Sequence, residues 1–255
     1  MILTAAARTD VGRRRSANED CFAFAPELGL YLVADGMGGH RAGRVASDLA
    51  AEGTVDALRR VRSADASLTE KLRYCVACAN HGIYAAASGK PELRGMGTTL
   101  VALLAGNGRI ALAHVGDSRA YLVRAGRIRQ LTDDHSLVAD LVRRRELSAR
   151  DARGHPHRHV LTRALGVRRA TEPDLAELTP APGDVVLLCS DGLTGHLLDE
   201  EIAKVVTSED DLDKVCEQLV AIANSRGGDD NITVALVRCD ENDQAQGRAP
   251  VGSVR

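Results

Sequence analysis

Acidic residues stand at the ends of several short apolar runs in this chain. Asp35, Asp117 and Asp191 each follow such a run and lie beside a glycine. Asp230 stands the other way round, immediately before the apolar run 232–237. Short β-rich runs bounded by glycine are typical of buried strands. In an antiparallel sheet, the end of an outgoing strand and the start of a returning one share a rim, so we expect these four carboxylates to converge.

The pair Glu19 and Asp20 belongs to the same predicted rim, because it directly precedes another short apolar run, 21–24. Converging carboxylates repel one another and lose hydration unless a cation neutralises them. Mg²⁺ and Mn²⁺ prefer oxygen ligands, and a glycine lets the backbone approach an ion and offer its carbonyl. Such a set fits two ions about 3.5–4 Å apart that share one carboxylate and a bridging water as the nucleophile.

A basic run, 13–15, stands just ahead of Glu19 and would place a guanidinium near this rim. Arginine donors suit a phosphate ester, and metals with arginine around one phosphate favour hydrolysis of phosphoryl esters. A single Asp-Gly pair is usually only a turn. The whole set at predicted strand ends favours a metal site instead.

Composition limits the possible partners. The chain has 255 residues, 44% of them hydrophobic, which is enough for one large domain. Its net charge of -2 and its 2% aromatic content argue against nucleic acid as the main partner. No run approaches the roughly 20 apolar residues that span a bilayer, and the start does not resemble a signal peptide. We therefore expect a cytoplasmic protein with no membrane partner and without a disulfide framework.

The predicted elements alternate between helical pairs and strand clusters. Alanine- and leucine-rich segments predict helices, and β-rich runs separated by turns predict an antiparallel meander. Helices are expected at 48–61, 68–87, 199–206 and 211–225, and strands at 98–104, 109–115, 120–123, 127–131, 185–190 and 232–237. The segment 136–154 is polar and helix-prone. This order predicts an α+β fold, a four-layer α-β-β-α sandwich of two antiparallel sheets packed face to face and flanked by helix pairs.

Several motifs together resemble the metal-dependent protein phosphatases (PPM, type 2C), in particular their bacterial branch. They follow the same order along nearly the whole chain. The matching segments are 9–12 with Arg15, 18–20, 33–40, 97–99, 116–119, 131–136, 161–166, 190–193 and 230–233. The resemblance implies an Mn²⁺- or Mg²⁺-dependent serine/threonine phosphatase. It would act on phosphoserine and phosphothreonine by direct attack of a metal-bridging hydroxide.

The same resemblance assigns roles to individual residues. Asp35 would bridge two metals, and the Gly36 carbonyl would bind the second. Asp191 and Asp230 would bind the first metal, and Asp117 with Asp191 a third, weaker one. The surrounding residues implied are Glu19, Asp20 and Asn231 near the metal-bound waters, with Asp20 also counted in the metal centre, and Arg15 on the phosphate. Arg15, Asp35 and Asp191 are thus the expected catalytic residues.

Some positions depart from the family pattern. Met37 stands where many eukaryotic members carry a histidine proposed as general acid. His159 stands where asparagine is common, in the segment 139–160 that resembles the family's mobile flap. We expect one catalytic domain over 1–240, with this flap, and a disordered tail over 241–255.

The resemblance implies phosphorylated proteins as partners, among them a serine/threonine kinase, and we expect a monomer. Two other functions stay open from the sequence: a catalytically silent relative that binds phosphoproteins, and a two-metal hydrolase of other phosphate esters. A zinc site at Cys75, Cys78 and His81 is disfavoured, because no second pair of ligands matches it.

Overall fold

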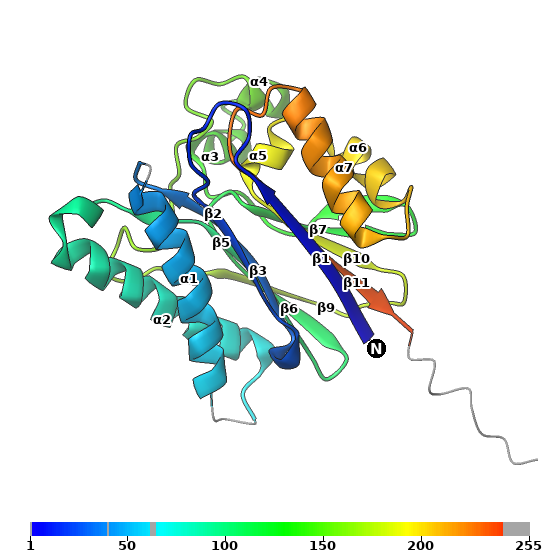
Figure 1. Cartoon of the computed structure of the whole chain (residues 1–255), viewed down its shortest axis with the longest axis horizontal. Coiled ribbons are helices and arrows are strands. Elements are labelled where there is room, and N and C mark those ends of the chain that lie inside the picture. Colours follow the sequence, from blue (N-terminus) through cyan, green and yellow to red (C-terminus); the bar gives the residue numbers. More distant parts are fainter. Residues whose placement is uncertain (1, 40, 62–64, 242–255) are drawn as a thin grey trace, which may run out of the picture.

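Two antiparallel sheets pack face to face, and helices cover both outer faces (Figure 1). The computed structural model describes residues 2–39, 41–61 and 65–241. In spatial order, the five-stranded sheet contains β1 (Ile2–Asp10), β11 (Ile232–Asp240), β10 (Val185–Cys189), β7 (Arg119–Arg124) and β8 (Arg127–Gln130). The second sheet contains β2 (Asp20–Ala25), β3 (Leu30–Met37), β5 (Leu100–Gly106), β6 (Arg109–Val115) and β9 (Asp174–Leu178), with the short β4 (Gly97–Thr98) paired to β3.

Each sheet carries its own pair of helices. Helices α1 (Arg41–Arg60) and α2 (Leu68–Gly89) pack on the sheet that contains β3, and α6 (Asp199–Val206) and α7 (Leu212–Ser225) on the sheet that contains β11. Three shorter helices lie together at one end of the sandwich (Figure 1): α3 (Leu137–Arg143), α4 (Ala149–Arg153) and α5 (Asp191–Thr194). Two 3-10 turns, Pro26–Leu28 and Pro91–Leu93, complete the described elements.

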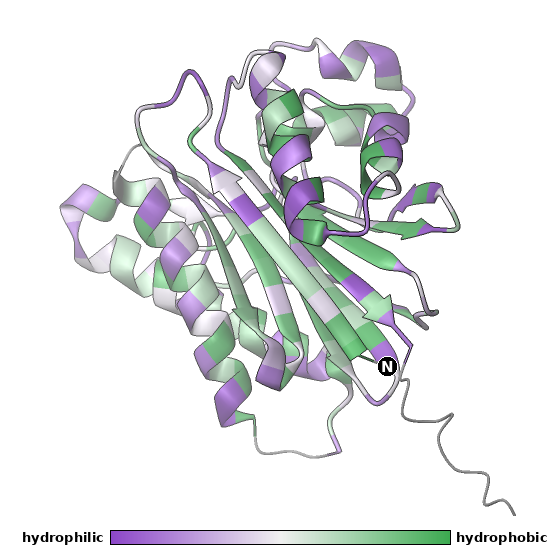
Figure 2. Cartoon of the chain, turned by 45° about the vertical axis from the view of Figure 1, so that its right-hand side comes forward, coloured by the Kyte–Doolittle hydropathy of each residue, from purple (hydrophilic) through white to green (hydrophobic). Residues whose placement is uncertain are grey.

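Three apolar clusters match the three interfaces between these four layers. One lies between α1, α2 and their sheet, and a second between α6, α7 and the other sheet. The third lies between the sheets and contains Val33, Leu112, Leu122 and Leu188. Figure 2 shows the helices striped, with polar residues along the sides that face away from the sheets. Alternation along the strands thus buries both faces of the sheets, and the predicted four-layer α+β sandwich is confirmed.

Most of the predicted elements are present, with shifted ends. The helix expected at 48–61 begins at residue 41, and the strand expected at 98–104 is broken at Thr99 into β4 and β5. Strands β1 and β9 were not predicted. The expected tail, from residue 242 on, lies outside the described residues.

Local capping explains where two of the helices begin. Ser67 accepts the backbone N–H of Glu70, and Glu70 in turn accepts the N–H of Ser67, which is a capping box at the start of α2. Asp211 caps α7 by accepting the backbone N–H groups of Asp213 and Lys214. All six cysteines are free, and no helix in the described part of the chain combines the length and apolarity needed to cross a membrane.

Candidate metal centre

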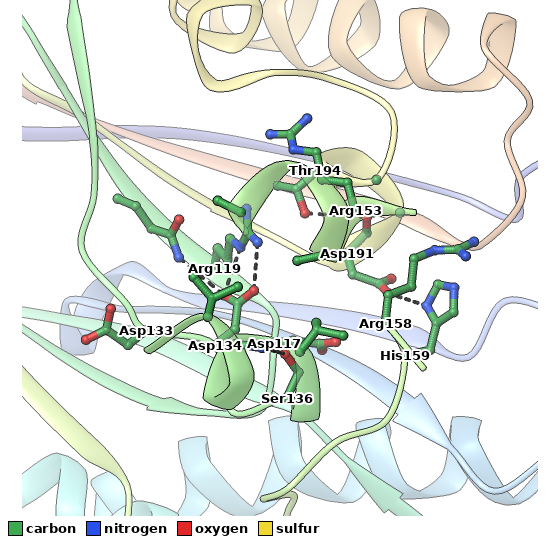
Figure 3. A pocket seen from close by; sticks show the side chains of 18 of the residues that line it. Asp117, Arg119, Asp133, Asp134, Ser136, Arg153, Arg158, His159, Asp191 and Thr194 are labelled. Atoms are coloured by element: carbon green, nitrogen blue, oxygen red, sulfur yellow. Dashed lines mark hydrogen bonds and ion pairs between the residues drawn. The ribbon is translucent and has the colours of Figure 1, made fainter. Parts of the chain in front are cut away.

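Five aspartates from both sheets come close enough to influence one another at the end of the sandwich that carries α5. Figure 3 shows two of them, Asp117 and Asp191. Asp20 on β2 and Asp35 on β3 lie directly opposite each other in the antiparallel register. Asp117 follows β6, Asp191 follows β10, and Asp230 precedes β11. The strand ends thus bring together the carboxylates that the sequence places there.

The backbone of Asp35 is fixed by two threonines. Its N–H donates to Thr99 Oγ1 at 2.9 Å, and its carbonyl accepts from Thr98 Oγ1 at 2.8 Å and from the Thr99 N–H at 2.9 Å. The Thr99 hydroxyl also lies 2.6 Å from Ser118 Oγ. Since Ser118 adjoins Asp117, the same short network holds two of the five aspartates.

Asp20 joins the two sheets. Its Oδ2 accepts from Ser190 Oγ at 2.7 Å and from Thr233 Oγ1 at 2.6 Å, both from the five-stranded sheet side. Its Oδ1 is buried and has no hydrogen-bond partner. The pKa of Asp20 is raised to about 7, mainly by burial; the two hydroxyls oppose the rise, and nearby acidic residues add to it.

The other four aspartates are half-buried. The pKa of Asp35 is nevertheless raised well above its usual value, first by desolvation and then by four neighbouring carboxylates: Asp20, Asp191, Asp117 and Asp230. Desolvation and the charge of Asp191 raise the pKa of Asp117 in the same way. The fold therefore gathers negative charges that repel one another.

Two side chains engage this rim. Arg15 Nη2 donates to Asp230 Oδ2 at 2.7 Å, and this hydrogen bond raises the pKa of the guanidinium. His159, from the predicted flap, places Nδ1 at 3.3 Å from Asp191 Oδ2. In the described residues, no three histidine, cysteine or acidic side chains close around one point as a finished metal site. Two of the carboxylates are instead occupied by Arg15 and His159.

The donor set fits hard divalent cations. The rim offers carboxylate oxygens, which Mg²⁺ and Mn²⁺ prefer, and two of them, Asp20 Oδ1 and Asp191 Oδ1, are buried without a hydrogen-bond partner. A buried carboxylate oxygen left in this way is costly unless a cation or water satisfies it. The mutual rise in pKa points in the same direction, because bound cations would remove the repulsion.

Gly36 has a packing role as well. A β-carbon there would overlap the Gly43 carbonyl and lie 2.7 Å from the Glu19 carbonyl oxygen. The start of α1 therefore approaches β3 backbone to backbone. The sequence analysis explained Gly36 by the approach of the backbone to an ion. The structure shows a second reason, the close contact between α1 and β3.

Asn231 holds the loop that carries Arg15. Its Oδ1 accepts the N–H of Glu19 at 2.8 Å, and its Nδ2 donates to the carbonyls of Val11 and Ala17, each at 2.9 Å. Glu19 is itself buried beside Gly43. The loop between β1 and β2 is thus fixed to the residue that follows Asp230.

The neighbouring Asp229 differs from Asp230. Its side chain is 58% exposed, against 27% for Asp230, and it pairs with Arg14 at 3.3 Å. Asp230 is therefore the more buried of the two neighbours.

Sequence reasoning missed the partners of these aspartates. Ser190 and Thr233 were not singled out, although Ser190 adjoins Asp191 and Thr233 is two residues after Asn231. The bidentate pair of Arg119 and Asp134, at 2.8 and 2.7 Å, was also missed. The available signal for Ser190 and Thr233 was that each is a hydroxyl residue in or beside an otherwise apolar strand, close to a predicted site residue.

A family model described as "Protein phosphatase 2C" matches residues 12–236. The chain belongs to the protein phosphatase 2C family. A serine/threonine phosphatase stp of Listeria monocytogenes is 42% identical over 241 residues, which are 91% of this chain and 94% of the relative. Protein phosphatase PhpP of Streptococcus pneumoniae is 38% identical over 92% of this chain and 97% of its own length.

Solved structures of this phosphatase family agree with the fold. The Mycobacterium tuberculosis phosphatase PstP/Ppp superposes with a TM-score of 0.86 at 37% identity, covering 94% of this chain and 100% of that one. A PstP catalytic domain in complex with two manganese ions gives 0.84 at 36% identity, with 94% and 99% covered. The chain is thus a metal-dependent protein serine/threonine phosphatase that uses Mn²⁺ or Mg²⁺ and acts on phosphoproteins.

Proposed function

We propose that this phosphatase hydrolyses phosphoserine and phosphothreonine at the aspartate rim. The supporting observation is the convergence of five carboxylates from both sheets beside Arg15, which is 2.7 Å from Asp230. The proposed ligands of two divalent ions are Asp35, the Gly36 carbonyl, Asp191 and Asp230, with Asp117 and Asp191 for a third. When bound, these ions supply positive charge at the phosphate and make water a better nucleophile near neutral pH.

The chain's own residues divide the remaining work. Arg15 has a side chain that is 52% exposed, so donors not used by Asp230 are free to bind phosphate oxygens. Asp20 is held by Ser190 and Thr233 and keeps the two sheets in register behind the rim. Glu19 and Asn231 position the loop that carries Arg15. In this proposal the nucleophile is water, and no side chain becomes phosphorylated.

The domain bounds, oligomeric state, location and partners of the enzyme are also proposed. We infer that the catalytic domain covers 1–240 with a flap at 139–160, and that the enzyme acts as a monomer. Six free thiols are typical of a reducing compartment and support a cytoplasmic location. A serine/threonine kinase and its phosphorylated targets are the proposed physiological substrates.

Phosphate release from phosphopeptides, titrated with Mn²⁺ and Mg²⁺, tests this function. We expect metal-dependent release from phosphoserine and phosphothreonine peptides, none in EDTA, and weak release from phosphotyrosine controls. No turnover at any metal concentration would favour a phosphoprotein-binding relative. Faster hydrolysis of bis-p-nitrophenyl phosphate than of the peptides would favour a hydrolase of other phosphate esters.

A further inference from the structure

A cavity of about 460 Å³ opens beside the aspartate rim. One wall contains Asp117, Asp191 and Asp230. The flap 139–160 supplies much of the opposite wall, including Val142, Ala152 and several basic side chains. A phosphorylated residue held at the rim would therefore have its neighbours in sequence inside this cavity.

Most acidic side chains in the wall outside the rim already have partners. Asp134 is bound by Arg119, Asp229 lies 3.3 Å from Arg14, and Asp199 accepts the Tyr121 hydroxyl at 3.3 Å. Asp133 makes no hydrogen bond or ion pair with any other described residue. The negative charge that stays uncompensated outside the rim is thus Asp133.

The basic side chains of the wall divide differently. Arg119 is used by Asp134, and Arg143 pairs with Asp140. Arg153 and Arg158 have no acidic partner among the residues that the structure describes. An arginine that lines a cavity without a carboxylate is available for an anion on a ligand.

The unpaired arginines lie apart from the unpaired aspartate. Figure 3 shows Arg158 beside Asp191 and His159 at one end, and Arg153 with its guanidinium extending toward Thr194. Asp133 lies at the other end, beyond the pair of Arg119 and Asp134. The two unpaired arginines of the cavity are therefore separated from its unpaired aspartate.

We propose that Arg153 is a specificity-determining residue that selects substrates with an anionic side chain close to the phosphorylated residue. The proposal rests on the function proposed above, since it needs the phosphate at the rim. The anion is either a carboxylate or a second phosphate, because an arginine fork binds both. Partial screening in an open cavity limits the expected selection to about threefold per unit of charge, or about tenfold between glutamate and lysine.

Arg150 offers a matched control for Arg153. Both arginines lie on α4 and are exposed, so substitution of either leaves the packing of the core intact. Only Arg153 lines the cavity. Comparing variants at the two positions therefore distinguishes an effect of binding within the cavity from an effect of the overall positive charge of the flap.

The experiment compares kcat/KM for three phosphothreonine peptides whose flanking residues are glutamate, glutamine or lysine. We expect the wild-type enzyme to favour the glutamate peptide over the lysine peptide by about tenfold. Arg153→Gln should bring this ratio close to one, mainly through KM, and Arg153→Glu should invert it. Arg150→Gln and Arg150→Glu should keep the wild-type ratio. A doubly phosphorylated peptide shows which of the two anions Arg153 prefers.

Three results would overturn the proposal: a wild-type ratio near one, an unchanged ratio in both Arg153 variants, or an equal loss in the Arg150 variants. Because each result is a ratio between peptides on one enzyme preparation, partial loss of folded protein cancels. Failure of the proposed function gives a different outcome, namely no metal-dependent release from any peptide.

Discussion

The aspartate rim is held by buried backbone and hydroxyl contacts, whereas the flap that faces it across the cavity is exposed along most of its length. At the rim, Asp20 is fully buried and Asp35 has its backbone fixed by Thr98 and Thr99. From Arg143 to Val160 the flap has few half-buried residues and no fully buried one. The side-chain hydrogen bond from the flap to the five aspartates is the one between His159 and Asp191.

This contrast follows from what each region must do. Carboxylates that repel one another stay together only if the surrounding structure fixes them, so the rim is built from strand ends and close glycine contacts. Recognition of substrate side chains needs exposed charge, which the flap provides through its arginines. We therefore expect substitutions at the rim to remove activity or folding, and substitutions on the flap to change selectivity or stability slightly.

The largest expected effect is loss of activity in Asp35→Asn. The substitution keeps the shape of the side chain but removes a proposed metal ligand, so phosphate release should fall by about a thousandfold or more. The metal-free variant should be at least as stable as wild type, because the lost charge is one that its neighbours repel. Kinetics and urea unfolding in EDTA measure the two effects.

Asp56→Asn is the control for Asp35→Asn. Asp56 is exposed on α1 and, among the residues that the structure describes, pairs only with Arg59, at 3.7 Å, so we expect wild-type kinetics. Near-normal activity of Asp35→Asn would contradict the proposed role of the rim in catalysis.

Gly36→Ala is expected to have the next largest effect. A β-carbon at this position would overlap the Gly43 carbonyl and crowd that of Glu19. Overpacking of backbone against backbone should cost about 3 kcal/mol of unfolding free energy. Gly82→Ala, in α2, is the counterpart: nothing lies within 4 Å of its β-carbon position, so stability should rise by about 0.5–1 kcal/mol. Urea unfolding of both variants tests whether the rim is the rigid region.

The sequence predicted the layers and the rim because both depend on local pattern. Apolar runs ending at Asp35, Asp117 and Asp191 defined strands and strand ends together. Strand β9 was missed because Asp174–Leu178 contains no β-branched or aromatic residue and its pairing with β6 is set by the fold. Strand β1 was missed because it is rich in alanine.

Contacts between distant segments could not be predicted in the same way. The bonds from Ser190 and Thr233 to Asp20 depend on how one sheet is placed over the other, which no local pattern encodes. The contact of His159 with Asp191 depends on the path of an exposed polar segment without clear periodicity. The early start of α1 depends on close contact between Gly43 and Gly36.

A pH dependence of stability should distinguish the rim in the metal-free protein. The pKa of Asp20 is about 7 when folded, against an ordinary value of 3.8. Between these values the folded chain holds a proton that the unfolded chain has lost, so the unfolding free energy should fall as pH rises from 5.5 to 7, by more than about 1 kcal/mol. Saturating Mn²⁺ should reverse the trend, since metal binds the deprotonated carboxylates.

Urea unfolding of wild type and Asp20→Asn across this pH range, in EDTA and in Mn²⁺, measures the slope. The difference between the two proteins isolates Asp20 from other titrating groups. Parallel curves in EDTA would mean that Asp20 is already ionised at low pH and that the rim tolerates its charge without metal.

The smallest expected effect concerns backbone conformations with positive φ, which the two regions treat differently. At the rim, Gly12 has a φ of 82°, and a β-carbon there would overlap the Asp230 carbonyl. On the flap, Arg145 has a φ of 61°, in a backbone region that residues other than glycine rarely adopt. Arg145→Gly should therefore raise the unfolding free energy by about 0.5–1 kcal/mol, after the greater freedom of the unfolded chain is counted. Ala125→Gly, at a φ of 49° in the turn between β7 and β8, should behave alike. Urea unfolding measures both variants. If Arg145→Gly lost stability while Ala125→Gly gained it, the Arg145 side chain would stabilise the flap by more than its backbone conformation costs.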